Sequence, residues 1–106
     1  MIAVIVEPTG TTFRIGQHVF PVTAEECRAL GEALSMSGVL GEVIETAAEW
    51  SLGTRWKLEL GGPDQRPYDD RRNRVVLHCD GKKWHLLPTE AENLGTSFAA
   101  AAGKMT

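Results

Sequence analysis

Apolar and polar residues alternate along several stretches of this chain, which is the pattern of a β-strand with one buried face. The clearest stretch is 54–60, where every second residue from Trp56 to Leu60 is apolar and the residues between them are charged. A β-branched run over 2–6, closed by a Pro-Thr-Gly segment, predicts another strand followed by a turn.

A two-residue turn at 16–17 (Gly-Gln) predicts the first of two β-hairpins. This turn sets the register, so that Ile15 lies opposite His18 and Phe13 lies opposite Phe20. Phe13, Ile15, Phe20 and Val22 then share one face, and Arg14 and Val19 take the other.

The second hairpin is predicted around 80–81, because Asp-Gly strongly favours a type I′ turn. Its register places Leu77 opposite Trp84 and Cys79 opposite Lys82 on one face. Four residues occupy the other face: Val76, His78, Lys83 and His85.

Capping signals and helical periodicity predict three helices. Thr23 begins a Thr-Ala-Glu-Glu capping box, which starts a helix that we expect Gly38 to end. An apolar stripe with glutamates on the opposite side predicts a second helix over 39–50. A second capping box at 89–92 starts a final helix, which an alanine run continues to Gly103.

Together these elements predict one α+β domain over residues 1–106, an antiparallel sheet built from two β-hairpins and further strands, with about three helices packed on one face. A constant offset of 64 residues superimposes the two hairpin-helix units, matching Phe13 to Leu77 and Gly31 to Gly95. Few matched pairs are identical and the capping threonines are two positions out of step. The pattern therefore fits either a ββα duplication or two unrelated units that follow the same local rules.

Composition excludes several classes of protein and names no function. The 106 residues, 42% hydrophobic and 24% charged, suit one globular domain and exclude collagen-like or disordered chains. The net charge of −3 is uneven, because residues 1–50 carry −5 and residues 51–106 carry +2. The sequence pI of about 5.6 argues against nucleic-acid binding by the protein as a whole.

Two cysteines, Cys27 and Cys79, occupy apolar positions and lack the C-x-x-C spacing of a metal or redox site. We expect both to be buried free thiols. The apolar start of the chain has no basic region and is cut short by Glu7 and Pro8, so we expect neither a signal peptide nor a membrane span. A cytoplasmic location follows as the expectation.

The segment 61–73 has no periodicity and five turn-forming or structure-breaking residues, which predicts a long surface loop. Arginines near a tyrosine are suited to binding carboxylate or phosphate groups, although the acids within the loop could also neutralise it. Trp50, at the end of the predicted acidic helix, is a further contact candidate. The predicted partner-binding residues are Arg66, Tyr68, Arg71, Arg72, Arg74, Lys82, Lys83 and Trp50.

No catalytic or metal site is predicted. His78 and His85 share one face of the second hairpin, but Cys79 points to the opposite face, so a Cys/His nucleophile pair cannot form there. Two histidines without further ligands do not define a zinc site, and no phosphate-binding glycine loop occurs.

We therefore expect a small non-catalytic protein-binding, adaptor or inhibitor module without a cofactor, whose protein partner the sequence does not identify. A homodimer is a further expectation. Nucleic-acid binding through the basic loop and hairpin of 66–83 is the first alternative, and a small metal-dependent enzyme using His78 and His85 is the second.

Overall fold

The computed structural model describes residues 2–41, 48–60 and 75–105. Within these ranges the element order is β1 (Ile2–Glu7), β2 (Gly10–Ile15), β3 (His18–Val22), α1 (Ala24–Gly41), β4 (Ala48–Leu52), β5 (Trp56–Leu60), β6 (Val75–Cys79), β7 (Lys82–Leu86) and α2 (Pro88–Lys104). The strands predicted over 2–6 and 54–60 are confirmed as β1 and β5. The loop predicted over 61–73 lies outside the described residues.

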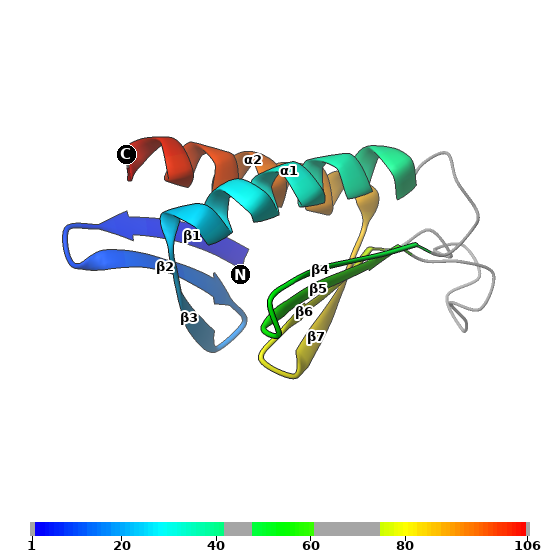
Figure 1. Ribbon diagram of the computed structural model, residues 1–106, viewed down its shortest axis with the longest axis horizontal. Helices are drawn as coiled ribbons and strands as arrows, with labels where there is room; N and C mark the ends of the chain where they lie inside the picture. Colours follow the sequence, from blue (N-terminus) through cyan, green and yellow to red (C-terminus); the bar gives the residue numbers. More distant parts are fainter. Residues whose placement is uncertain (1, 42–47, 61–74, 106) are drawn as a thin grey trace.

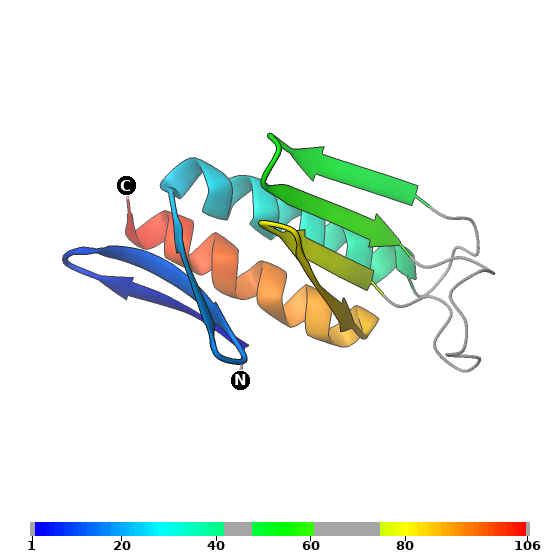
Figure 2. The same cartoon turned by 90° about the horizontal axis from the view of Figure 1, so that it is seen from below.

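The fold is α+β, as predicted, but it has two antiparallel sheets where one was expected. One sheet has the order β1-β2-β3 and the other β4-β5-β6-β7. The helices α1 and α2 lie side by side, run in opposite directions and cover one side of both sheets (Figures 1 and 2). The helix α1 follows β3 after Thr23 alone and stands in the chain between the strands of the two sheets.

The helix predicted over 39–50 is wrong. The first helix continues through Gly38 to Gly41, and residues 48–52 form β4. Gly38 is needed for a close approach between helices, because a Cβ there would lie 2.6 Å from the carbonyl oxygen of Pro88. Trp50 therefore lies on a strand, where its half-buried side chain packs against the core. Residues 42–47 are outside the described residues. The described residues form two helices, whereas three were predicted.

The cap predicted for the first helix is confirmed, and the cap predicted for the last helix is wrong by two residues. Thr23 accepts a bond of 3.1 Å from the backbone N–H of Glu26, and its own N–H donates to Glu26 Oε1 at 2.9 Å. The last helix begins at Pro88 after Leu87, whose N–H donates to Glu90 Oε1 at 2.9 Å. Proline suits the first helical position because it has no N–H to satisfy there.

Both predicted hairpin registers are confirmed. Phe13 pairs with Phe20 in the first hairpin, and Leu77 pairs with Trp84 in the second. Asp80 and Gly81 have φ values of 51° and 83°, as the type I′ turn requires.

One core joins both sheets and both helices, and Phe13 is at its centre with none of its surface exposed. Its ring centroid lies 5.3 Å from that of Phe98 on α2, 5.9 Å from that of Trp56 on β5 and 6.5 Å from that of Trp84 on β7. Aromatic pairs at these distances add to the stability that burial itself supplies.

The two halves of the chain share an order of three strands followed by a helix, β1-β2-β3-α1 and β5-β6-β7-α2. In the first half Val4 pairs with Phe13, and in the second half Leu58 pairs with Leu77. Each central strand is therefore flanked in the same way. The halves differ in the connection between their first two strands, which is residues 8–9 in one and residues 61–74 in the other.

The two helices meet at a pair of glycines that the 64-residue offset relates. A Cβ on Gly31 would lie 2.9 Å from the backbone nitrogen of Ala99, and a Cβ on Gly95 would lie 2.7 Å from that of Ser35. Ser35 and Ala99 are separated by the same offset. The helix backbones thus approach each other more closely than any side chain at either glycine would allow.

Candidate functional site

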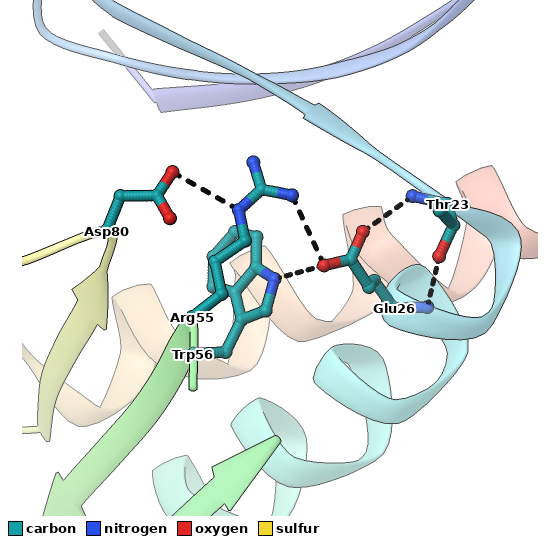
Figure 3. A network of polar contacts seen from close by, with 5 residues as sticks. All are labelled: Thr23, Glu26, Arg55, Trp56 and Asp80. Atoms are coloured by element: carbon teal, nitrogen blue, oxygen red, sulfur yellow. Dashed lines mark hydrogen bonds and ion pairs between the residues drawn. The ribbon is translucent and has the colours of Figure 1, made fainter. Parts of the chain in front are cut away.

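A network of polar side chains joins the start of α1 to the four-stranded sheet, and we call it the Glu26 junction (Figure 3). Glu26 Oε2 accepts a bond of 2.6 Å from Trp56 Nε1 and lies 3.3 Å from Arg55 Nη1. Arg55 Nε donates to Asp80 Oδ2 at 3.2 Å. Together with Thr23 at the helix cap, these residues link three separate parts of the chain.

Opposing effects act on the pKa of Glu26. Burial raises it, but the bonds donated by Thr23 and Trp56 and the positive charge of Arg55 outweigh burial, so the pKa lies below its ordinary value of 4.5. The carboxylate is therefore charged at neutral pH, and its side chain is 18% exposed. This environment favours a structural anion, since a general acid or base needs a pKa nearer to neutrality.

The sequence predicted the helix cap in the Glu26 junction but not the contacts of Glu26 with the four-stranded sheet. The capping box identified Glu26 as a helix-capping residue, and both capping bonds are present. Its second carboxylate oxygen bonds to residues 29 and 30 positions away, Arg55 and Trp56. No local pattern specifies such a contact.

A row of charged side chains crosses the face of the four-stranded sheet opposite the core. Lys57 Nζ lies 3.3 Å from Glu49 Oε2 on β4 and 3.3 Å from Glu59 Oε1 on its own strand. The same Glu59 oxygen lies 2.9 Å from His78 Nε2 on β6. Lys57 and the two glutamates pair their charges within the row, and exposed pairs of this kind contribute little to stability.

The candidate catalytic groups on β6 and β7 are not arranged for nucleophilic chemistry. His78 faces the charged row, whereas Cys79 is fully buried on the core side. Burial, helped by the neighbouring Asp80 carboxylate, raises the pKa of the Cys79 thiol to about 11. Burial likewise raises the pKa of Cys27 to about 11. Both thiols are protonated at neutral pH and are poor nucleophiles.

The structure describes three of the eight predicted partner-binding residues. Lys82 and Lys83 are exposed on β7, and Trp50 is half-buried on β4. The other five, Arg66, Tyr68, Arg71, Arg72 and Arg74, lie outside the described residues.

The two lysines lie towards the end of the hairpin opposite to Val75, the first described residue after the predicted basic loop. The chain re-enters the sheet after residue 74 at Val75, which pairs with Leu86. Lys82 is four residues from Leu86 along β7, about 13 Å at the usual rise of a strand. The structure therefore separates Lys82 from the point where the loop joins the sheet, although the sequence grouped them.

Two shallow hollows lie beside α2. The larger, of about 280 Å³, is lined by Arg28, Glu32, Ala99, Ala102 and Gly103. The smaller, of about 210 Å³, is lined by Ile2, Glu90, Asn93, Leu94 and Ser97. Neither places an imidazole or a thiol beside a carboxylate, as a nucleophile and its base would require.

Within residues 2–41, 48–60 and 75–105, no group of three His, Cys, Asp or Glu side chains is placed to hold a metal ion. Neither of the two described helices combines the length and apolarity needed to cross a bilayer.

Comparison with known proteins found no match for this chain among protein-family models, curated proteins or solved structures.

Proposed function

We propose that this protein is a non-catalytic binding module, an adaptor or inhibitor that recognises an acidic surface on a partner protein. Its contact surface is formed by the basic segment 66–74 and by Lys82 and Lys83 on β7. The observation that carries the proposal is the state of these two lysines. Both are exposed, and neither has an acidic partner among the described residues.

Three other cations, on the strands or in the turn between β4 and β5, differ from these lysines because each has an acidic partner. Arg14 lies 3.6 Å from Glu7, Arg55 bonds within the Glu26 junction, and Lys57 lies between two glutamates. A lysine without an ion pair is free to form one with an acidic group of a partner. Such charges increase the rate of association with an acidic surface and favour the correct partner.

The proposal is tested by capturing partners from a lysate of the native organism with wild-type and variant baits. The first variant is Arg71→Glu with Arg72→Glu, and the second is Lys82→Glu with Lys83→Glu. The matched control is Arg28→Glu with Lys104→Glu, which makes the same charge change at exposed positions on the helices. The captured protein is then identified, purified and titrated against all four chains.

We expect wild type and control to bind the purified partner equally, and each test variant to bind it at least about tenfold more weakly, since reversing two charges costs 1.4 kcal/mol or more. Equal binding by all four chains would exclude this surface, and recovery of no partner would contradict the adaptor function.

Nucleic-acid binding through the same residues is the alternative, and salt separates the two. A nucleic-acid complex weakens steeply between about 50 and 200 mM salt and collapses when Arg71 and Arg72 become alanine. A gel shift that shows no complex at about 50 mM salt excludes it.

We also infer that the two halves derive from one duplicated hairpin-helix unit. The caps support this inference, because the bonds from the N–H groups of Thr23 and Leu87 to Glu26 and Glu90 obey the 64-residue offset. The crossing of Gly31 and Gly95 supports it as well. A chain circularly permuted to begin within 42–47 should fold, since it keeps both units whole; a permuted chain that fails to fold would count against equivalent units.

A further inference from the structure

Strand β1 forms an edge of its sheet, and its segment 2–6 has neither the charge nor the proline that usually protects an edge against pairing with another strand. Among the described residues it has a neighbour on one side only, β2. Its sequence from Ile2 to Val6 is Ile-Ala-Val-Ile-Val, without charge or proline. Ile2 and Val6 are 39% and 36% exposed. Natural sheets seldom leave an apolar edge of this kind uncovered.

The other three edge strands each carry a protective residue. β3 contains Pro21, which lacks the N–H that pairing would require. β4 carries Glu49, and β7 carries Lys82 and Lys83, whose charges oppose the approach of another strand. The charge on β1, Glu7, lies at the end of the strand beside the turn and 3.6 Å from Arg14, so the segment 2–6 has neither a charge nor a proline.

The free backbone groups of β1 belong to three specific residues. The two-residue turn at 8–9 closes on Glu7 and Gly10, which pair across it. Hydrogen-bonded and non-hydrogen-bonded pairs alternate along an antiparallel ladder. Counting back from the turn, Ile2, Val4 and Val6 point their N–H and C=O groups away from β2 and towards the open edge.

The second half of the molecule shows what fits at this edge. There the equivalent strand is β5, in which Trp56 and Leu58 occupy the positions that Ile2 and Val4 occupy in β1. The open side of β5 is covered by an antiparallel strand, β4, with Trp50 opposite Leu58 and Leu52 opposite Trp56.

We propose that β1 of a second copy of this chain takes the place beside β1 that β4 takes beside β5, forming a homodimer with a continuous six-stranded sheet. The two β1 strands run antiparallel and meet at Val4, about a two-fold axis. Ile2 of each copy then lies opposite Val6 of the other.

This register is the one that the strand itself favours. Pairing about Val4 uses the outward backbone groups of all three residues in both copies, whereas a shift by two residues leaves some of them without a partner. It also brings together the two most exposed apolar side chains of the strand, Ile2 and Val6. Glu7 lies beyond this segment, so no like charges face each other across it.

Space beside β1 is consistent with a second strand. The hollow of about 210 Å³ between β1 and α2 is lined by Ile2 and by Leu94 of the helix. In the other half, the 64-residue offset relates Leu94 to Leu30 on α1, and α1 lies against both β5 and β4. Thus the helix that covers β5 also reaches its partner strand, and the hollow lies beside Ile2 on α2, the helix that contacts β1.

The test is a pair of complementary charge variants of the whole protein, measured by sedimentation and light scattering. One chain carries Ile2→Lys with Val6→Lys, and the other carries Ile2→Glu with Val6→Glu. In the proposed register like charges face each other in each homodimer and opposite charges face each other in the mixed dimer. The control is Val19→Lys on β3, which is 54% exposed and lies on the other edge of the sheet.

We expect wild type and the Val19→Lys control to have twice the chain mass of 11.6 kDa. Each doubly charged variant should have a dimer Kd raised roughly 100-fold or more, because like charges placed opposite each other are costly. An equimolar mixture of the two variants should restore the dimer as a mixed species.

A monomeric wild type overturns the proposal, whether the edge stays open or accepts a strand of another protein. Variants that dimerise as wild type does place the dimer interface elsewhere, and also overturn it. If either variant misfolds alone, the mixture still decides, because formation of a folded mixed dimer supports the register and its failure contradicts it.

Discussion

The first strand of each half differs in what covers its open side. β5 has β4 beside it, whereas β1, in the equivalent position, has no strand there within the described residues. The segment that follows α1 supplies the covering strand for the second half. One plan of three strands and a helix thus gives a covered sheet in one half and an apolar edge in the other.

The two halves share their backbone geometry but differ in their polar contacts. They share pairing registers, helix caps and the glycine crossing. They differ in the polar contacts at the start of each helix, because Glu26 bonds to Arg55 and Trp56 whereas the equivalent Glu90 is exposed. Strand pairing and the helix crossing are therefore common to both halves, whereas the bonds from a capping glutamate to Arg55 and Trp56 are made by Glu26 alone of the two.

The largest effect is expected at the central positions of the two sheets. Phe13→Ala should lower the free energy of unfolding by about 4 kcal/mol, and the equivalent Leu77→Ala by about 3 kcal/mol, since both side chains are fully buried. Chemical denaturation with fluorescence detection measures both values. A cost below about 1 kcal/mol at Phe13 would show that the two sheets do not share one core.

A smaller effect is expected where the helices cross. Gly31→Ala and Gly95→Ala should each cost about 1–3 kcal/mol, because either Cβ would meet the backbone of the other helix below 3.0 Å. Gly103→Ala is the control, since a Cβ there meets nothing within 4 Å; it should be neutral or stabilising by up to about 1 kcal/mol. A large difference between the losses of unfolding free energy at Gly31 and Gly95 would contradict the structural equivalence of the two halves.

The smallest effect is expected at the two capping glutamates, and it depends on pH. Glu26→Gln should cost about 1–2 kcal/mol at pH 7, because the charged carboxylate accepts bonds that an amide accepts less well. Glu90→Gln should cost less, since Glu90 has no corresponding bonds to a sheet among the described residues.

The direction of this pH dependence follows from the lowered pKa of Glu26 in the folded state. A lowered pKa stabilises the fold fully above the unfolded value near 4.5, and this stability is lost as the pH falls through the folded-state pKa. The difference between wild type and Glu26→Gln should therefore be constant near neutrality and disappear in acid. Thermal unfolding between pH 7 and pH 2.5 measures it, and a difference that grows in acid would contradict the assignment.

Much of the local structure could be predicted from the sequence. The Gly16-Gln17 and Asp80-Gly81 turns set two registers that the structure confirms, and the Thr23 capping box is present as predicted. Burial of Cys27 and Cys79 followed from their apolar positions. These features depend on residues close together in the chain.

The predictions were wrong where a residue is compatible with two different local structures. Gly38 can end a helix or permit close packing, and only the position of α2 shows that it permits packing. Trp50 fits a helical stripe over 39–50 but also the alternation of β4, in which it faces the core. For the candidate site, the sequence grouped Lys82 and Lys83 with the basic loop, but their distance from Val75 depends on the strand pairing.

The sequence by itself determined the turns, the first helix cap, the hairpin registers and the buried faces, because each depends on dihedral preferences and hydrogen bonds within a few residues. Tertiary structure decided how far α1 extends, that the strands divide into two sheets, and that Glu26 receives Trp56 and Arg55. These outcomes depend on packing between distant segments, where the burial of large apolar surfaces outweighs weak local preferences.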